Sequence, residues 1–348
     1  MNIEFKPIKD LPLEIKTFTE DYKIPREVSP YQYAPWQENV VKNFQSSYGL
    51  KHLVRAEFCT YKNNGAAAIF PFQYNRFSKN GEIMLFGSGG MSDYLNLIYN
   101  EQFSYEDFIL LIRAVTQRTG RKSFYFNLLQ EKTRTYDYVQ RLAVRQDECN
   151  ICVRIALPSS YDAYYSSLSK STRQNVRTAI NRMNKQGLNS ELRLFTNSDI
   201  TSEIVQDMLE IYAERYEKKN QYNRLSMLQN VKKFLMQGKR NLISDALGKT
   251  EGSLVAAEYI EGKMAAYAFM LFDRDRKIVC VPRVATAEAF YFFSPGMLLF
   301  VDFIREVYQK NPLIDKIEVI DLTNGDETYK FRLNGISDNP THKIYFSI

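Results

Sequence analysis

The chain has 348 residues, a formal net charge of +6 and a hydrophobic content of 45%. This length is typical of two domains of about 100–200 residues, each able to bury its own core. The ordinary apolar and charged fractions, with 24 tyrosines and 23 phenylalanines, exclude disordered and fibrous chains. The modest positive charge is spread along the chain, so it suits a phosphate-bearing small ligand and does not indicate DNA binding.

The sequence also limits location and chemistry. No run approaches the roughly 18 apolar residues of a membrane span, and we expect a cytoplasmic protein without a transmembrane segment. Only Cys149 and Cys152 form a close cysteine pair, and the chain has two histidines, His52 and His342. We therefore predict no metal site, and the shortage of imidazole counts against Ser-His or Cys-His nucleophilic catalysis.

The first half predicts mixed α and β structure. Apolar periodicity and turn residues indicate, in order, a helix over 31–44, strands over 52–61 and 66–74, a strand over 81–87, a glycine-rich loop over 87–94, a strand over 95–99, a helix over 104–120 and a strand over 122–129. The two strands 52–61 and 66–74 flank Asn63-Asn64-Gly65, a typical hairpin turn.

The second half repeats a longer version of this order, with a boundary at 145–155. We predict a strand over 152–157, helices over 161–186, 201–218 and 224–237, a meander of strands 253–260, 263–273 and 277–285, a helix from Ser294-Pro295, a strand over 316–322, a short segment over 328–335 and a last strand over 342–348. Gly187 is expected to end the first helix in a left-handed cap. The prediction is an α+β protein with domains 1–150 and 151–348, whose last strand can pair with the N-terminal domain.

The helix within 168–188 carries a candidate ligand clamp. Lys170, Arg173 and Arg177 recur at i, i+3 and i+7 and form one basic ridge. The ridge lies beside an apolar stripe that is expected to face the core: Val176, Ala179, Ile180 and Met183. Sheltered guanidinium groups bind phosphate or carboxylate in forked geometry. The alternative is a solvated basic helix face.

Two further segments are candidates for chemistry. The Ser294-Pro295-Gly296 turn starts a helix directly after a strand, so free backbone N–H groups favour an anion there; the alternative is an ordinary helix start. Residues 319–335 place acidic, phenolic and amino groups past the end of an apolar strand: Asp321, Asp326, Glu327, Tyr329 and Lys330. The Lys330 ammonium can stabilise an oxyanion while a carboxylate or phenol moves protons. The alternative is a surface turn at Asn324-Gly325.

Three segments resemble one family. LSKSTRQNVRTAINRMNKQGL resembles an "L-S-x-x-x-R-x-x-x-R" helix, and SPGMLL followed by IDLTNGDETYKFRLNG resembles the "SPG…D-x-x-x-G-D-x-x-Y-K" signature. Both are typical of the CelD-like acetyltransferases of the GNAT superfamily, relatives of the FemAB-type peptidyltransferases. SDYLNLIY resembles the "s-D-Y" segment of their degenerate N-terminal domain. The similarity spans about residues 30 to 335.

This resemblance implies tandem GNAT-like domains, each a mixed, mostly antiparallel sheet flanked by helices, and direct attack of an acceptor amine or hydroxyl on an activated acyl group. It implies acyl-CoA as co-substrate, without a tightly bound cofactor, and an acceptor linked to a sugar or cell-envelope precursor. The resemblance implies roles for Lys330 as a catalytic group and for Arg173, Arg177, Asp93 and Tyr94 as ligand or cleft contacts. Together with the residues singled out above, the expected site consists of the catalytic groups Lys330, Tyr329 and Asp321, the substrate contacts Arg173, Arg177, Lys170, Asp93, Tyr94 and Asp326, and the donor contacts Ser294, Gly296 and Met297.

One departure leaves the donor open. The usual GNAT pyrophosphate loop, Q/R-x-x-G-x-G/A, is replaced here by FFSPGM with a single glycine. FemAB-type enzymes lack that loop and take the acyl group from aminoacyl-tRNA, so a tRNA-dependent transferase acting on a cell-wall precursor is the first alternative. A non-catalytic protein that binds a glycan or phosphorylated precursor is the second.

Overall fold

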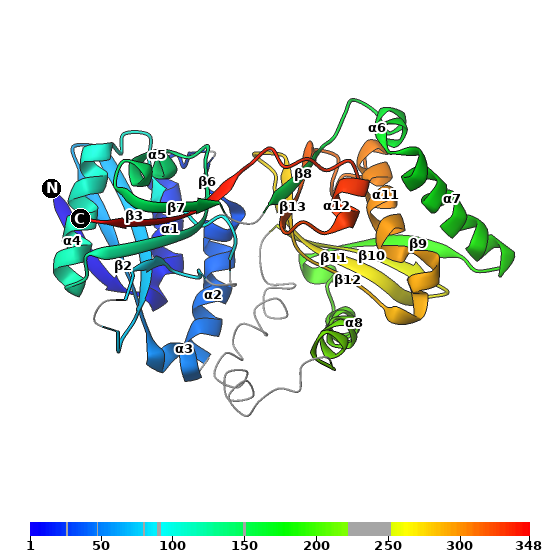
Figure 1. Ribbon diagram of the computed structural model, residues 1–348, viewed down its shortest axis with the longest axis horizontal. Coiled ribbons are helices and arrows are strands. Elements are labelled where there is room, and N and C mark those ends of the chain that lie inside the picture. Colours follow the sequence, from blue (N-terminus) through cyan, green and yellow to red (C-terminus); the bar gives the residue numbers. More distant parts are fainter. Residues whose placement is uncertain (26, 47, 79–80, 89–91, 149–150, 222–251) are drawn as a thin grey trace. The chain divides into compact units, whose positions relative to one another are not determined.

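The computed structural model describes the chain except residues 26, 47, 79–80, 89–91, 149–150 and 222–251 (Figure 1). The described residues form two compact units. The N-terminal unit contains residues 1–151 together with 339–348, and the C-terminal unit contains the described residues between 152 and 338. The last strand therefore belongs to the N-terminal unit. The predicted α+β class is confirmed.

The N-terminal unit is built on two antiparallel sheets. Its helices and strands are β1 (Asn2–Pro7), α1 (Leu11–Asp21), α2 (Ala34–Ser46), α3 (Tyr48–Leu53), β2 (Val54–Asn63), β3 (Ala66–Asn75), β4 (Met84–Leu85), β5 (Ile98–Tyr99), α4 (Tyr105–Thr119), β6 (Ser123–Gln130), α5 (Arg134–Gln140), β7 (Ala143–Glu148) and β14 (Thr341–Ser347). One sheet has the order β1-β2-β3-β4, with β5 paired to β3, and the other has the order β6-β14-β7. Asn64 and Gly65 join β2 to β3 with positive φ angles of 47° and 87°, which suit a tight hairpin.

The C-terminal unit is built on one six-stranded sheet of order β8-β13-β12-β11-β10-β9. Its elements are β8 (Cys152–Ala156), α6 (Tyr161–Ser167), α7 (Lys170–Lys185), β9 (Ser190–Thr196), α8 (Ser202–Gln221), β10 (Ser253–Ile260), β11 (Lys263–Asp273), β12 (Ile278–Thr286), the 3-10 helix η4 (Glu288–Phe293), α11 (Pro295–Tyr308), β13 (Val319–Asn324) and α12 (Thr328–Arg332). All neighbouring strands are antiparallel except β12 and β13, which are parallel. The candidate site lies where this parallel pair separates.

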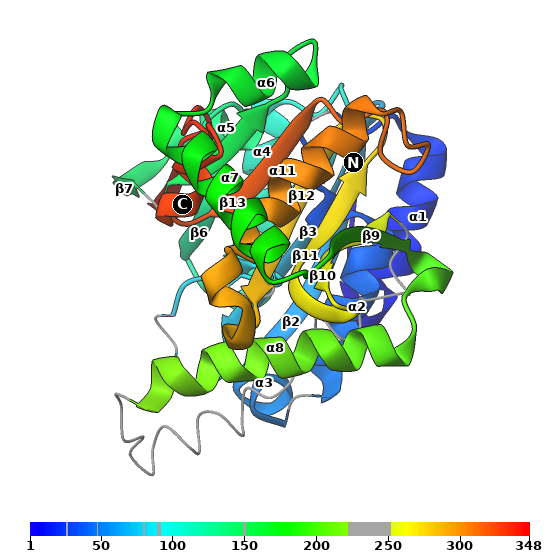
Figure 2. The same ribbon diagram turned by 90° about the vertical axis from the view of Figure 1, so that its right-hand side faces the viewer.

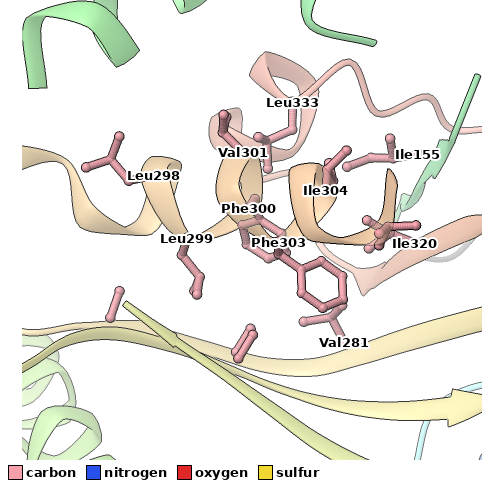
Figure 3. Close-up of a cluster of buried hydrophobic side chains, with 14 of the residues drawn as sticks. Ile155, Val281, Leu298, Leu299, Phe300, Val301, Phe303, Ile304, Ile320 and Leu333 are labelled. Carbon is pink, nitrogen blue, oxygen red and sulfur yellow. The ribbon is translucent and has the colours of Figure 1, made fainter. Parts of the chain in front are cut away.

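Helices cover both faces of this sheet. Helix α11 lies on one face against β10 and β11, with α7 packed beside it, and α8 contacts β11 and β12 on the other face (Figures 1 and 2). The α11 side chains bury an almost continuous apolar surface, and Figure 3 shows Leu299, Phe300 and Phe303 among residues of β12 and β13. Each such side chain contributes about 1.5–3 kcal/mol by leaving water. The position of the α11 N-terminus is therefore fixed by the core.

The helix predicted over 161–186 is two helices. Leu168 is buried and extended, with ψ of 145°, and the side chain of Ser169 accepts a hydrogen bond from the Thr172 N–H to start α7. A capping serine and a core leucine therefore break the helix where apolar spacing alone predicts continuity. The predicted left-handed residue at Gly187 is present, with φ of 67°.

The apolar stripe of α7 also differs in one member from the prediction. Val176, Ala179 and Met183 are buried, but Ile180 is 38% exposed and the buried Thr172 completes the stripe. Ile180 directly follows Ala179, and a helix turns by about 100° per residue, so adjacent positions point in different directions. The stripe is therefore narrower than predicted.

Two of the predicted strands are shorter in the structure, and strand β9 was not predicted. The strands expected over 81–87 and 95–99 reduce to β4 and β5. Strand β9 was not expected, because its segment comes directly after two helices and has only two apolar residues in alternation, Leu192 and Leu194. Such a short polar segment cannot be distinguished from a loop by sequence. The helix predicted over 224–237 lies outside the described residues.

A buried carboxyl group lies in strand β10. Glu258 is fully buried on the face that also carries Leu254, Ala256 and Ile260. Its oxygens have no hydrogen-bond partner of good geometry among the described residues, although Ser190 lies close enough to lower its pKa slightly. Removal from water, with the nearby charge of Asp302, raises the pKa of Glu258 from 4.5 to about 8. The folded protein therefore holds a proton there that the unfolded chain releases at neutral pH.

This difference predicts a pH-dependent stability. Between about pH 4.5 and 8 the native state binds one more proton than the unfolded state, so the free energy of unfolding should fall by up to about 1.4 kcal/mol per pH unit as pH rises. Glu258→Gln should remove this slope and give a variant that is more stable than the wild type at pH 8. Urea unfolding at pH 5 to 9 measures the effect, with the exposed Glu203→Gln as control. Parallel curves for the wild type and Glu258→Gln would contradict the assignment.

Candidate functional site

The site begins where the two parallel strands separate. The β12–β13 ladder has only three pairs, Ile278–Val319, Val279–Ile320 and Cys280–Asp321. Beyond them β12 continues along β11 as far as Thr286, while β13 stays with β8 as far as Asn324. A gap therefore opens between strands that are adjacent at their start.

Local backbone features support this separation. Val281 and Pro282 lie opposite Met270 in a β-bulge, and bulges bend the strand that contains them. Pro282 also has no N–H to donate to a neighbouring strand. On β13, Thr323 has a φ of 55°, and its hydroxyl donates to the Val281 carbonyl at 3.3 Å. This contact ties the strands together at the narrow end of the gap.

A cavity of about 960 Å3 occupies this gap. Its walls come from β12, the 3-10 helix η4, the first turn of α11, the end of β13 and α12, with one residue each from α7 and α8. The charged residues of the lining are Arg283, Arg332, Lys330 and Glu327. The cavity therefore has an excess of positive charge.

The first turn of α11 offers a single backbone donor. Pro295 has no N–H, and the N–H groups of Met297 and Leu298 donate to the Ser294 carbonyl at 3.0 and 3.3 Å. Within the described chain, the Gly296 N–H has no acceptor. This donor lies at the positive end of a helix of 14 residues, a position that favours anions.

The predicted N-cap takes an unexpected form. Ser294 occupies the N-cap position, but its φ of 50° is left-handed and its side chain makes no capping hydrogen bond. A Cβ at Gly296 would lie 2.9 Å from the Thr286 hydroxyl, so glycine permits a close approach of α11 to the end of β12. Arg283 lies nearby on β12, with its guanidinium 4.0 Å from the ring centroid of Tyr212.

Lys330 lies at the opposite end of the cavity lining, in α12. Its side chain is almost fully buried, and its Nζ donates to the carbonyls of Thr323, Asn324 and Gly325 at 3.2, 2.9 and 3.2 Å. The Oε2 atom of Glu327 lies 3.1 Å from the same nitrogen. An ammonium has three protons, so these acceptors engage the whole group and hold the loop between β13 and α12.

The structure brings together part of the predicted site. Five of the predicted residues line the cavity: Ser294, Gly296, Met297, Tyr329 and Lys330. Asp321 lies behind it, buried, with its Oδ2 at 2.7 Å from Arg154 Nε and its Oδ1 accepting from the Thr323 N–H. Asp326 is exposed and is not part of the lining. The chemical roles of all of these residues stay predictions.

The basic ridge of α7 lies outside the lining. Arg173 donates from Nη1 to the carbonyls of Ser166 and Leu168 and so caps the end of α6. Lys170 and Arg177 are exposed, and α7 contributes Asn175 to the lining instead.

The remaining predicted substrate contacts lie in the N-terminal unit. Tyr94 is buried against Tyr31, and Asp93 is half-buried beside it. Cys149 of the cysteine pair lies outside the described residues.

Sequence reasoning missed the contribution of β12. Arg283 and Thr286 line the cavity, yet the sequence reads as an ordinary strand of a meander. The available signal was Pro282, because a proline inside a strand marks an edge or a bulge.

Comparison with known proteins agrees with this architecture. Residues 170–331 match the model of the "Acetyltransferase (GNAT) domain" family. A conserved protein of unknown function from Bacteroides thetaiotaomicron is 13% identical, with a TM-score of 0.56 over 99% of this chain and 100% of that one. The C-terminal domain of a putative lysylphosphatidylglycerol synthetase from Agrobacterium fabrum is 11% identical, with a TM-score of 0.54 over 97% and 92%. L-PGS from Bacillus licheniformis is 10% identical, with a TM-score of 0.52 over 97% and 91%.

At these identities the structural matches show the fold alone, and the predicted α+β fold of mostly antiparallel sheets flanked by helices is confirmed. The GNAT domain model covers part of the C-terminal unit. No curated protein matches the sequence. Among the described helices, none combines the length and the apolar character needed to cross a bilayer.

The environment of Lys330 predicts a structural cost for its removal. Lys330→Met should lower the free energy of unfolding by at least about 2 kcal/mol, because it leaves three loop carbonyls without their shared donor. Urea unfolding followed by circular dichroism measures this loss. The exposed Lys316→Met is the matched control and should change stability by less than about 0.5 kcal/mol. Equal stability of the two variants would show that the loop does not depend on the ammonium.

Proposed function

We propose that the C-terminal unit is an N-acyltransferase that moves an acyl group, acetyl in the simplest case, from acyl-CoA to an amino group. The observation that carries the proposal is the gap between the parallel strands β12 and β13, which opens beside the N-terminus of α11. The gap gives space for an extended donor, and the helix gives a site for its phosphates. The match of residues 170–331 to an acetyltransferase domain model supports the same reaction class.

The two ends of the cavity suit the two ends of acyl-CoA. The diphosphate would lie at the first turn of α11, against the Gly296 N–H and the guanidinium of Arg283. The pantetheine arm, an extended chain with two amide groups, would follow β12, since strand edges bind extended amide chains through main-chain hydrogen bonds. The thioester would then lie near Val281 and Thr323, where the strands converge.

The chemistry proposed is direct transfer. Both histidines, His52 and His342, belong to the N-terminal unit, so the C-terminal unit has no imidazole to activate a serine or cysteine. Of the described cysteines in this unit, Cys152 and Cys280 are buried, and burial raises the pKa of the Cys280 thiol. The amine nitrogen would attack the thioester carbon, the C–S bond would break, and coenzyme A would leave as the thiol without an acyl-enzyme intermediate.

The acceptor is proposed from the sequence resemblance and not from the cavity. The resemblance to CelD-like proteins favours an amino sugar linked to a polysaccharide or cell-envelope precursor, made in the cytoplasm. Lys330 is proposed to order the loop at the narrow end of the cavity, and its predicted action on the oxyanion would require one of its carbonyl contacts to be exchanged.

One observation favours the second candidate donor. The first turn of α11 has one free N–H instead of the several that a glycine-rich loop provides, which weakens the case for a diphosphate. A FemAB-like transferase would take its acyl group from aminoacyl-tRNA, and exposed Lys170 and Arg177 would suit the tRNA backbone. Saturable binding of charged tRNA without binding of acyl-CoA would decide for it.

The donor site can be tested by calorimetric titration with acetyl-CoA. Arg283→Ala should weaken binding about 10-fold or more, because a charge-assisted hydrogen bond contributes about 1.5–3 kcal/mol. Arg193→Ala is a matched control, since Arg193 also stacks on a tyrosine, Tyr259, at 4.3 Å but lies outside the cavity. Equal affinity of the two variants would exclude the proposed donor position, and failure of the wild type to bind would exclude acyl-CoA.

A further inference from the structure

The cavity contains one carboxylate. Among the described lining residues, Glu327 alone is acidic. The other two carboxyl groups of the same segment are placed elsewhere, because Asp321 is buried in its ion pair with Arg154 and Asp326 points into solvent outside the lining. The structure thus separates three neighbouring carboxylates that the sequence leaves equivalent.

The Glu327 carboxylate is held in a defined position. Gly325 has a φ of 124°, and a Cβ at this position would collide with Oε2 of Glu327. The same oxygen lies 3.1 Å from the buried Nζ of Lys330. The side chain is nevertheless 48% exposed. It is therefore fixed on one side by the loop and accessible to a molecule in the cavity.

Among the described residues, no other carboxylate and no imidazole lines the cavity. Glu258 is fully buried beneath α11 and away from the cavity lining. Both histidines belong to the N-terminal unit. A proton acceptor for an amine must reach the reacting nitrogen, either directly or through one water.

We propose that Glu327 is the proton acceptor of the acyl transfer, with Lys330 as its positioning residue. This inference rests on the proposed function. As the neutral amine attacks the thioester carbon, its nitrogen becomes positively charged and passes one proton to the Glu327 carboxylate. The C–S bond then breaks, the thiolate of coenzyme A takes a proton, and Glu327 returns to its charged form. The products are an amide and a free thiol, with no net gain or loss of protons.

The test is Glu327→Gln, which keeps the size of the side chain and a hydrogen-bond acceptor for Lys330 but removes the base. The probes are acetyl-CoA as donor and glucosamine, UDP-glucosamine and spermidine as amines, with thiol release as the assay. We expect kcat to fall about 100-fold or more with the best amine. The Kd of acetyl-CoA should change less than about twofold. The rise of kcat with pH on its acid limb should disappear, and Glu327→Asp should restore part of the rate.

The controls separate this role from a purely structural one. Glu203→Gln removes an exposed carboxylate of α8 and should leave all measured values unchanged. If Glu327 were only the counter-ion of Lys330, Glu327→Gln would lower the melting temperature and keep the pH profile, and this result would overturn the inference. Wild-type kcat in a stably folded Glu327→Gln variant would overturn it as well, while the proposed function would stand. Absence of thiol release by the wild type with every amine would overturn both.

Discussion

The separation of β12 from β13 after Cys280 and Asp321 is the constraint on which the C-terminal unit depends. Two parallel strands that share a sheet normally continue their ladder, because unpaired backbone groups are costly when buried. Here the ladder ends because each strand is held by its other neighbour: β12 follows β11 to Thr286, and Asp321 binds Arg154 of β8. Pro282 removes a donor at the same point. The apolar face of α11 packs on the sheet beside the separated strands, with Leu299 and Phe303 on the side of the helix that faces the sheet (Figure 3).

The loop that closes the narrow end depends on a single buried cation. Three consecutive carbonyls, of residues 323–325, converge on Lys330, and this convergence uses the left-handed φ of Thr323 and the φ of 124° at Gly325. A buried ammonium is unfavourable unless it is fully hydrogen bonded, and the same holds for buried carbonyls. The lysine and the strained loop therefore stabilise each other. In consequence the carboxylate of Glu327, two residues after Gly325, lies beside the Lys330 ammonium.

The sequence predicted most strands of the C-terminal sheet and the helix start at Ser294, but not the geometry of single side chains. The meander over 253–285 and the helix start at Ser294 follow from alternation, turn residues and a proline, which are local signals. The break at Leu168 and Ser169 was missed because a buried leucine fits the helical period. Arg173 was predicted to bind a ligand since its spacing is periodic, yet spacing does not show that the carbonyls at the end of α6 lie within its reach. Strand β9 is defined by its antiparallel pairing with β10, and the sequence of the segment alone does not show this pairing.

Three carboxyl groups of the C-terminal unit show how environment, rather than residue type, separates possible roles. Glu258 is fully buried without a paired cation, and its raised pKa keeps it mostly protonated at neutral pH, so it is a poor acceptor for a proton from an amine. Asp321 is buried with a guanidinium, and its oxygens are used to hold β13 and the Thr323 N–H. Glu327 has one oxygen beside a cation and half of its side chain in contact with solvent. A base needs charge, access and a fixed position at once, and among these three groups only Glu327 combines them.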